Sequence, residues 1–181
     1  MILINLFGGP GSGKSTGAAY IFSKLKMAGV NAELVTEFAK DKVWEESKAV
    51  FENQAYIFGK QYFRISRCAD KVDVIVTDSP LQLSIIYNKD PVLGENFNNM
   101  VEDVADSFNS LNYMIKRVKG YNPVGRHQTE AESDTLATEI KAMLQSRQYA
   151  YEEVDGNEAG YDHIVDSILK ELKINGKQIK N

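Results

Sequence analysis

Residues 8–16 read GGPGSGKST and follow the pattern G-x-x-x-x-G-K-[ST], with Gly8, Gly13, Lys14 and Ser15 in the fixed positions. Glycines allow a tight turn and let the backbone approach a polyphosphate closely. Successive backbone N–H groups at the start of a helix then form an anion-binding concavity. Lys14 is suited to the β- and γ-phosphates, and the Ser15 hydroxyl is suited to Mg²⁺. The predicted nucleotide-binding residues are Gly8, Gly9, Pro10, Gly11, Ser12, Gly13, Lys14, Ser15 and Thr16.

The sequence on both sides of this stretch supports the interpretation. Residues 2–7 (ILINLF) are apolar apart from one asparagine and predict a buried strand. Apolar residues recur at helical spacing from Ala18 to Met27, and Gly29 is a typical helix stop. Strand, glycine loop and helix is the order that a phosphate-binding loop requires, whereas a glycine-rich turn with a stray lysine does not explain it. We therefore expect ATP to bind here.

Composition limits the remaining choices. The chain has 181 residues, 43% hydrophobic and 25% charged, which is typical of one globular domain with a sizeable core. A formal charge of −4 gives no general attraction to nucleic acid, so DNA contact would need a local basic patch. The single cysteine, Cys68, excludes an internal disulfide framework and a cysteine-built metal site, and we expect a buried neutral thiol.

Two further features of the sequence bear on the cellular location of the protein. No run approaches the roughly 18 apolar residues that a membrane span needs. The N-terminus leads directly into the first predicted strand, which leaves no room for a signal peptide. We therefore expect a cytoplasmic protein without a membrane partner, and we leave open whether it forms a homodimer.

Alternating strands and helices predict the fold class. Further strands are expected at residues 31–36, 72–77, 111–115 and 149–154, and further helices at 51–70, 96–108, 131–148 and 164–172. This order is typical of an α/β fold in which a five-stranded parallel sheet lies between two helical layers. We expect one P-loop NTPase domain over residues 1–181, with a short lid at about residues 117–130. Ligands of such sheets bind at the carboxyl ends of the strands.

Two carboxylates follow predicted strands. Asp78 comes directly after VDVIVT and is placed to hold Mg²⁺, with helix capping as the alternative role. Glu37 lies at the end of the second strand, where it is suited to accept a proton from an attacking hydroxyl, with a solvated or capping glutamate as the alternative. The expected metal ligands are therefore Ser15 and Asp78.

A basic, turn-rich segment follows the fourth strand. Lys116, Arg117, Lys119 and Arg126 place four positive charges within eleven residues. Arginines on a closing loop can stabilise the charge of a transferring phosphoryl group, whereas a solvated basic loop is the alternative. The expected catalytic residues are Lys14, Glu37, Asp78, Arg117 and Arg126.

Residues 51–70 contain one apolar stripe, and their polar residues are by default solvent-facing. Gln54 and Gln61 are nevertheless candidate base readers. Several aromatic residues nearby could stack on a nucleobase, although aromatic residues at helical spacing are usually core: Trp44, Phe51, Tyr56, Phe58 and Tyr62. His127 and His163 have no metal-ligand spacing around them and are expected to be ordinary polar residues.

These motifs, in this order, resemble small P-loop nucleoside and nucleotide kinases. VTEFAKD after strand two and VDVIVTDSPLQLSIIY around strand three are similar to motifs of the thymidylate and deoxynucleoside kinase group, and the chain also resembles nicotinamide-riboside kinase domains. FGKQYFRISR is similar to the base-reading helix of deoxynucleoside kinases, although Ser79 replaces the family arginine. The resemblance implies ATP and Mg²⁺ as cofactors and an acceptor site made of Glu37, Phe38, Gln54, Phe58, Gln61 and Ser79.

The chain also resembles small P-loop proteins of tailed bacteriophages. Some relatives in the thymidylate kinase superfamily phosphorylate 5-hydroxymethyluracil within DNA. The resemblance adds DNA modification to the expected functions, DNA as an alternative acceptor, and the host cytoplasm as the location. The basic lid is compatible with a DNA acceptor, whereas the acidic net charge argues mildly against it.

Two other function classes remain as alternatives. An AAA-type ATPase usually has an acidic residue after the strand-three aspartate to position water, and this chain has Ser79 there. A GTP-dependent switch is less compatible, because Asn88-Lys89-Asp90 lacks the intervening residue of the guanine-reading motif and no Asp-x-x-Gly follows strand three.

Overall fold

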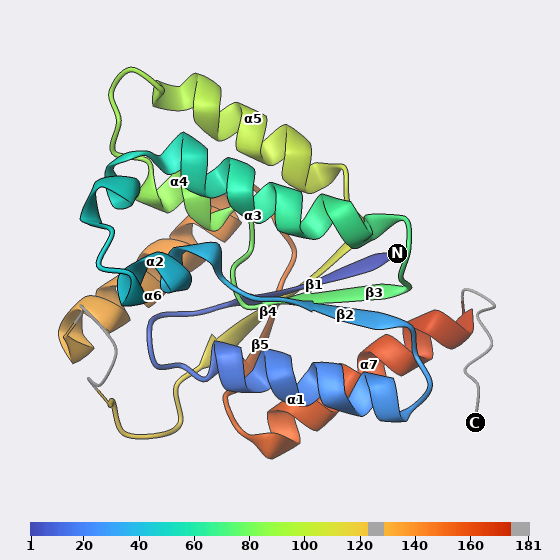
Figure 1. The fold of residues 1–181 in the computed structure, drawn as a ribbon. Coiled ribbons are helices and arrows are strands. Elements are labelled where there is room, and N and C mark those ends of the chain that lie inside the picture. The colour runs from blue at the N-terminus through green and yellow to red at the C-terminus, as the bar shows by residue number, and fades with distance from the viewer. Residues whose placement is uncertain (123–128, 175–181) are drawn as a thin grey trace.

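A parallel five-stranded sheet forms the centre of the protein, with the strand order β2-β3-β1-β4-β5 (Figure 1). The computed structural model describes residues 1–122 and 129–174. The strands are β1 (Ile2–Phe7), β2 (Ala32–Val35), β3 (Val74–Thr77), β4 (Ser110–Lys116) and β5 (Glu152–Asp155). All six residues of β1 are buried, as expected for the middle strand of a sheet that is covered on both faces.

Helices cover both faces of the sheet, so the domain has three layers (Figure 1). One face packs against α1 (Lys14–Met27) and α7 (Glu158–Ile174). The other face packs against α3 (Gln54–Ala69), α5 (Gly94–Asp106) and α6 (Glu130–Ser146). Three short elements complete the described chain: α2 (Phe38–Trp44), the 3₁₀ helix η1 (Lys48–Glu52) and α4 (Leu83–Tyr87). The predicted α/β fold with a five-stranded parallel sheet is confirmed.

Alternation along β1 divides the core into its two halves. Ile2, Ile4 and Leu6 pack with the α1–α7 layer, whereas Leu3 and Phe7 pack with the opposite layer. Asn5 lies on that second face and donates a hydrogen bond from Nδ2 to Asn112 Oδ1 of β4 at 2.9 Å. A polar pair at this buried position is unusual in a hydrophobic core.

Three sequence predictions were wrong in detail, and one helix, α2 at residues 38–44, was not predicted. Residues 51–70 contain the end of η1 and then α3 rather than one helix. Asn53 ends the first of these and caps the second, because its Oδ1 accepts a hydrogen bond from Tyr56 N at 2.9 Å. The fifth strand begins at Glu152 instead of Tyr149, and the last helix begins at Glu158, six residues earlier than predicted.

The parallel register brings the carboxyl ends of the strands to one edge of the sheet. Asn5 of β1 pairs with Thr77 of β3, and Thr77 also pairs with Val35 of β2. The phosphate-binding loop, Glu37 and Asp78 therefore emerge side by side.

Among the described residues, no helix combines the length and apolar character needed to span a bilayer. Cys68 is half-buried, and burial raises the pKa of its thiol.

Candidate active site

The loop of residues 8–13 connects β1 to α1 and has the conformation that its glycines allow. Gly13 is the N-cap of α1 and has a left-handed backbone with φ 104°, which a residue with a side chain rarely adopts. A Cβ atom on Gly9 would lie 2.4 Å from the Ser133 carbonyl oxygen of α6, so this position must also be glycine. The loop thus ends at a helix N-terminus, where backbone N–H groups and the helix dipole favour phosphate.

The Lys14 ammonium lies back over the loop. Its Nζ donates hydrogen bonds to the carbonyl oxygens of Gly8 at 2.7 Å and Gly9 at 3.0 Å. An ammonium has three donors and is mobile on its four-carbon stem, so it can exchange these carbonyls for phosphate oxygens. The predicted role of Lys14 in binding the β- and γ-phosphates fits this position.

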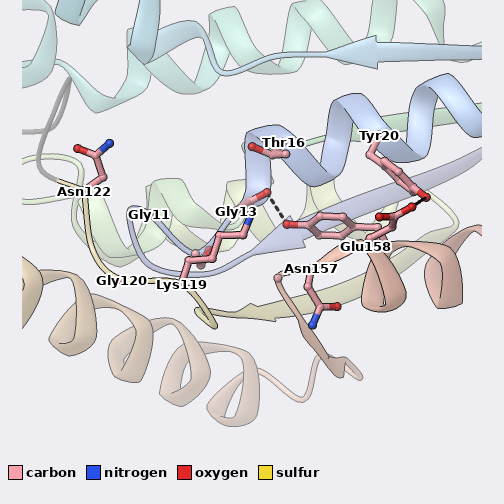
Figure 2. A pocket seen from close by; sticks show the side chains of 12 residues that line it. Gly11, Gly13, Thr16, Tyr20, Lys119, Gly120, Asn122, Asn157 and Glu158 are labelled. Carbon is pink, nitrogen blue, oxygen red and sulfur yellow. Dashed lines mark hydrogen bonds between the residues drawn. The ribbon is translucent and has the colours of Figure 1, made fainter.

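A cavity of about 340 Å³ lies beside the loop, on the side of α7 (Figure 2). Figure 2 shows Tyr20 of α1, Glu158 of α7 and Lys119 of the lid around it, and Thr16 projects from the first turn of α1. Its lining residues are Gly11, Ser12, Gly13, Thr16, Tyr20, Lys119, Gly120, Asn122, Gly156, Asn157, Glu158 and Tyr161. The cavity adjoins the phosphate-binding loop and has the position and polarity needed for the nucleoside part of a bound nucleotide.

Sequence reasoning missed most of this cavity. The residues after β5, Gly156 to Glu158, follow a strand end just as Glu37 and Asp78 do, so the topology alone could have identified them. Tyr20 and Tyr161 gave no such signal, since aromatic residues inside amphipathic helices are normally core.

The backbone of Glu37 contacts the side chain of Asp78, the second predicted carboxylate. The backbone N–H of Glu37 donates a hydrogen bond to Asp78 Oδ1 at 3.1 Å. Asp78 is only 5% exposed, and it does not cap a helix, because the N-cap of α4 is Gln82. Glu37 is the N-cap of α2, but its side chain makes no capping hydrogen bond. Both carboxylates therefore lie at the carboxyl edge of the sheet, and neither makes a helix-capping hydrogen bond.

The electrostatic environment of Glu37 differs from that of an exposed glutamate. Burial raises the pKa of Glu37, the positive charge of Lys14 opposes the shift, and the negative charge of Asp78 adds to it. The charges of Lys14 and Asp78 shift the pKa of Glu37 because the three residues lie in one site. A carboxylate with a raised pKa is a better proton acceptor, as a general base requires.

Ser15 and Asp78 provide an oxygen donor set that fits Mg²⁺. This ion is usually held by one or two protein ligands together with substrate phosphates and water, rather than by a full protein cage. The described residues contain no group of three or more His, Cys, Asp or Glu side chains placed to hold a metal. Ser15 lies in the first turn of α1, and the buried carboxylate of Asp78 directly follows β3.

The two predicted base-reading glutamines, Gln54 and Gln61, are buried and bonded to the protein. Gln61 Oε1 accepts a hydrogen bond from Phe38 N at 2.9 Å, and its Nε2 lies 3.4 Å from Thr77 Oγ1. Gln54 Nε2 donates to Ser84 Oγ at 3.1 Å. The two amides thus tie α3 to α2, to β3 and to α4. Both are buried, contrary to the default expectation of solvated residues.

The predicted aromatic acceptor residues are also mainly packing residues. Phe58 is 5% exposed and lies between the Tyr62 ring, 6.2 Å away and parallel, and the Phe97 ring of α5. Phe38 is 7% exposed and contacts Tyr56 edge-on. Ser79 donates its backbone N–H to Thr77 Oγ1 at 3.1 Å and is half-buried. Of the other aromatic candidates, Trp44 and Phe51 are 71% and 41% exposed.

Tyr87 of α4 is a further residue whose surroundings include Glu37. Burial chiefly, and also the negative charge of Glu37, raise the pKa of Tyr87 to about 12, although 44% of the residue remains exposed.

Of the two lid arginines, Arg117 lies at the base of the predicted lid and Arg126 lies outside the described residues. The Arg117 guanidinium contacts Asp134 at 2.6 Å and Glu130 at 3.1 Å, both on α6, and stacks over the Tyr121 ring. It is thus held by α6 in this structure. Its Nη1 also lies 3.5 Å from Ser133 Oγ, which in turn bonds the carbonyl oxygen of Pro10 in the phosphate-binding loop. Of the two histidines, His163 pairs with Glu152, and His127 lies outside the described residues.

Together the fold and the loop define a P-loop nucleotide-binding domain. A family model described as "AAA domain" matches residues 3–159, and the chain belongs to that family. No sequence among curated proteins matches it.

Two solved structures have the same fold. One is the NadR protein in complex with NR, with a TM-score of 0.71 and 18% identity over 99% of this chain. The chain spans about half, 53%, of that protein's length. The other is deoxyadenosine kinase from M. mycoides with bound dATP, with a TM-score of 0.57 and 18% identity over 94% of this chain and 99% of that one.

Proposed function

We propose that the protein is a kinase that transfers the γ-phosphoryl group of ATP to a hydroxyl or phosphate of a nucleoside-type acceptor, with Mg²⁺. The main supporting observation is the contact between Glu37 and Asp78 beside Lys14, at the carboxyl ends of β2, β3 and β1. An NTP hydrolase needs to position only water. The protein has in addition a second carboxylate with a raised pKa, which suits proton transfer from an acceptor hydroxyl.

In the proposed reaction, an acceptor oxygen forms a bond to the γ-phosphorus while the bond from that phosphorus to the β-bridging oxygen breaks. Glu37 accepts the acceptor proton, and ADP leaves. Lys14 and the N–H groups of residues 8–13 hold the phosphate chain, with Ser15 and Asp78 as the Mg²⁺ ligands. When bound, Mg²⁺ neutralises charge on the phosphate oxygens. The cavity beside Tyr20 and Glu158 would hold the donor nucleoside.

The acceptor is proposed by chemical class from the two structural neighbours. NadR was solved with NR, and the second neighbour is a deoxyadenosine kinase, so both have nucleoside-type ligands. On this chain, the buried amides of Gln54 and Gln61 fix α3 against α2 and α4, the helices that follow Glu37 and Asp78. A free nucleoside or nucleotide and 5-hydroxymethyluracil within DNA present the same kind of acceptor, and the assay must distinguish them.

The test uses γ-labelled ATP with Mg²⁺ and three acceptor sets: free nucleosides, nucleoside monophosphates and DNA containing 5-hydroxymethyluracil. We expect label in one of these sets. Glu37→Gln should abolish the transfer while ATP still binds, and Glu46→Gln is the matched control, since Glu46 is an exposed glutamate of the same segment. Label that reaches only water with every set would contradict the kinase proposal.

The family description favours a second candidate, an ATPase module without a small-molecule acceptor. Ser79 argues against it, because the residue after Asp78 is not acidic and cannot position water as a carboxylate does. ATP hydrolysis with ATP-dependent hexamers in light scattering, and no transfer to any acceptor, would support this second candidate over the first.

A further inference from the structure

We infer that Ser133 and Tyr161 are positioning residues that hold the phosphate-binding loop in its anion-binding form. Each donates a side-chain hydroxyl to a carbonyl oxygen of the loop. Ser133 Oγ of α6 donates to Pro10 O at 2.7 Å, and Tyr161 OH of α7 donates to Gly13 O at 3.0 Å. The inference rests on the nucleotide-binding half of the proposed function and is independent of phosphoryl transfer.

The physical reason is the geometry of a peptide unit. When the N–H groups of a loop converge on an anion, its carbonyl oxygens are turned outward, away from the anion, and each must find another donor. Gly13 O accepts both Gly17 N of α1 and the Tyr161 hydroxyl, which uses both lone pairs of the carbonyl. A donor fixed to an outward-facing carbonyl therefore fixes the direction of the N–H groups on the other side.

Lys14 shows why donors outside the loop matter. Its ammonium bonds Gly8 O and Gly9 O in this structure, but a bound triphosphate attracts the same ammonium. When the Lys14 ammonium turns to the phosphate, the carbonyl oxygens of Gly8 and Gly9 lose its hydrogen bonds. Ser133 and Tyr161 belong to other helices, and their bonds to Pro10 and Gly13 do not depend on where Lys14 points. They can stabilise the loop in the free and in the bound state alike.

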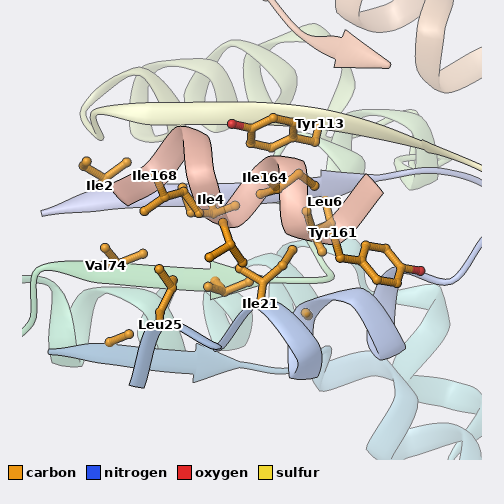
Figure 3. Packing of buried hydrophobic residues seen from close by; sticks show 14 of the residues in the cluster. Ile2, Ile4, Leu6, Ile21, Leu25, Val74, Tyr113, Tyr161, Ile164 and Ile168 are labelled. Atoms are coloured by element: carbon orange, nitrogen blue, oxygen red, sulfur yellow. The ribbon is translucent and has the colours of Figure 1, made fainter. Parts of the chain in front are cut away.

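Both hydroxyls are fixed by their own surroundings. Ser133 is 2% exposed and Tyr161 is 4% exposed. Ser133 lies in the first turn of α6, whose start is fixed by a capping box between Thr129 and Glu132. The Tyr161 ring belongs to the hydrophobic cluster between α1, α7 and the sheet (Figure 3). Moving either residue away from the loop would require its helix to move. The two hydroxyls are therefore preorganised against the loop.

The experiment compares Tyr161→Phe, Ser133→Ala and the double variant with the unmodified protein. Two matched controls remove a similar hydroxyl elsewhere. Tyr113→Phe lies in the same cluster as Tyr161, with its hydroxyl directed away from the loop (Figure 3), and Ser146→Ala lies at the opposite end of α6 from Ser133. The probes are ATP with Mg²⁺ and inorganic tripolyphosphate, with dissociation constants from calorimetry and melting temperatures measured without ligand.

We expect each variant to weaken ATP and tripolyphosphate by the same factor, roughly 2- to 10-fold for the loss of one hydrogen bond. Ser133→Thr, which keeps a hydroxyl, should restore binding. A purely structural role would lower the melting temperature without changing the affinity measured well below it. Unchanged tripolyphosphate affinity, or an equal loss in the controls, would overturn the inference, as would an unmodified protein that binds no tripolyphosphate. If the protein binds both probes but transfers no phosphate, the kinase proposal fails, while reduced binding by the variants still supports this inference.

Discussion

The two halves of the site are encoded differently along the chain. The donor half rests on nine consecutive residues, 8–16, and binds through backbone groups whose geometry the glycines permit. The acceptor half is assembled from α2, α3, β3 and α4, and depends on buried side chains such as Gln54 and Gln61. A backbone-built site can be recognised in a sequence from its spacing. A side-chain-built site becomes visible only when distant elements are placed together.

The difference also separates the chemical roles. In the proposed site, the donor half provides hydrogen-bond donors and one positive charge, whereas the acceptor half provides Glu37, whose backbone N–H contacts the Asp78 carboxylate. Variants of acceptor-half residues that are not proposed Mg²⁺ ligands, such as Glu37, should therefore affect catalysis and leave ATP binding intact. Variants beside the donor half should affect the stability of the α1–α7 layer and the binding of ATP.

The largest expected effect comes from Glu37→Gln. Removing a general base lowers kcat roughly 10²- to 10⁴-fold, while the dissociation constant for ATP should remain within about 3-fold, because Glu37 belongs to the acceptor half. Steady-state kinetics and ATP titration measure the two quantities. A variant that loses ATP affinity as strongly as kcat would show that the two halves are not separate.

Gln61→Ala should lower the free energy of unfolding by about 1–3 kcal/mol, since it leaves the buried Phe38 N–H and Thr77 hydroxyl without their amide partner. It should also raise the KM for the acceptor, because α2 is then less firmly tied to α3. Denaturant unfolding and acceptor kinetics provide the two measurements. Lys60→Ala, at the exposed neighbouring position, is the control and should change stability by about 0.5 kcal/mol or less.

Gly17→Ala tests the donor half. A Cβ atom at Gly17 would lie 2.5 Å from a ring carbon of Tyr161, and that ring is buried. Overpacking should cost about 1–3 kcal/mol of unfolding free energy, partly offset by about 1 kcal/mol of better helix propensity. Thermal unfolding measures the net loss, and ATP titration should show weaker binding. An increase in stability together with unchanged ATP affinity would contradict the close α1–α7 contact.

The smallest expected effect is a shift in pH dependence. Because burial and Asp78 raise the pKa of Glu37, the acidic limb of kcat/KM should lie above the ordinary glutamate range. The same shift acts on stability. A carboxyl whose pKa is raised in the folded state stabilises the fold while it is protonated, and this contribution is lost as pH rises through the raised value. Glu37→Gln should thus be more stable than the unmodified protein at neutral pH and similar to it near pH 4. An acidic limb at or below the ordinary value would show that Lys14 dominates.

The contrast between the backbone-built half and the side-chain-built half also explains which features can be predicted from the sequence. The loop, the five strands and the two strand-end residues Glu37 and Asp78 follow from local patterns, and the structure joins these two residues by a hydrogen bond from Glu37 N to Asp78 Oδ1. Helix α2 was missed because residues 38–44 show no apolar stripe. Gln61 was expected in solvent by default, since nothing in its local sequence indicates the buried partners, Phe38 N and Thr77, that lie 23 and 16 residues away.

The central position of β1 has a consequence for local and global unfolding. Paired on both sides and buried at all six residues, β1 can expose its amides only when the whole sheet comes apart, so its hydrogen exchange should report global unfolding. Strand β2 lies at the sheet edge with one partner and can separate locally. The phosphate-binding loop thus follows the strand that we expect to exchange most slowly, whereas Glu37 follows an edge strand that can separate locally.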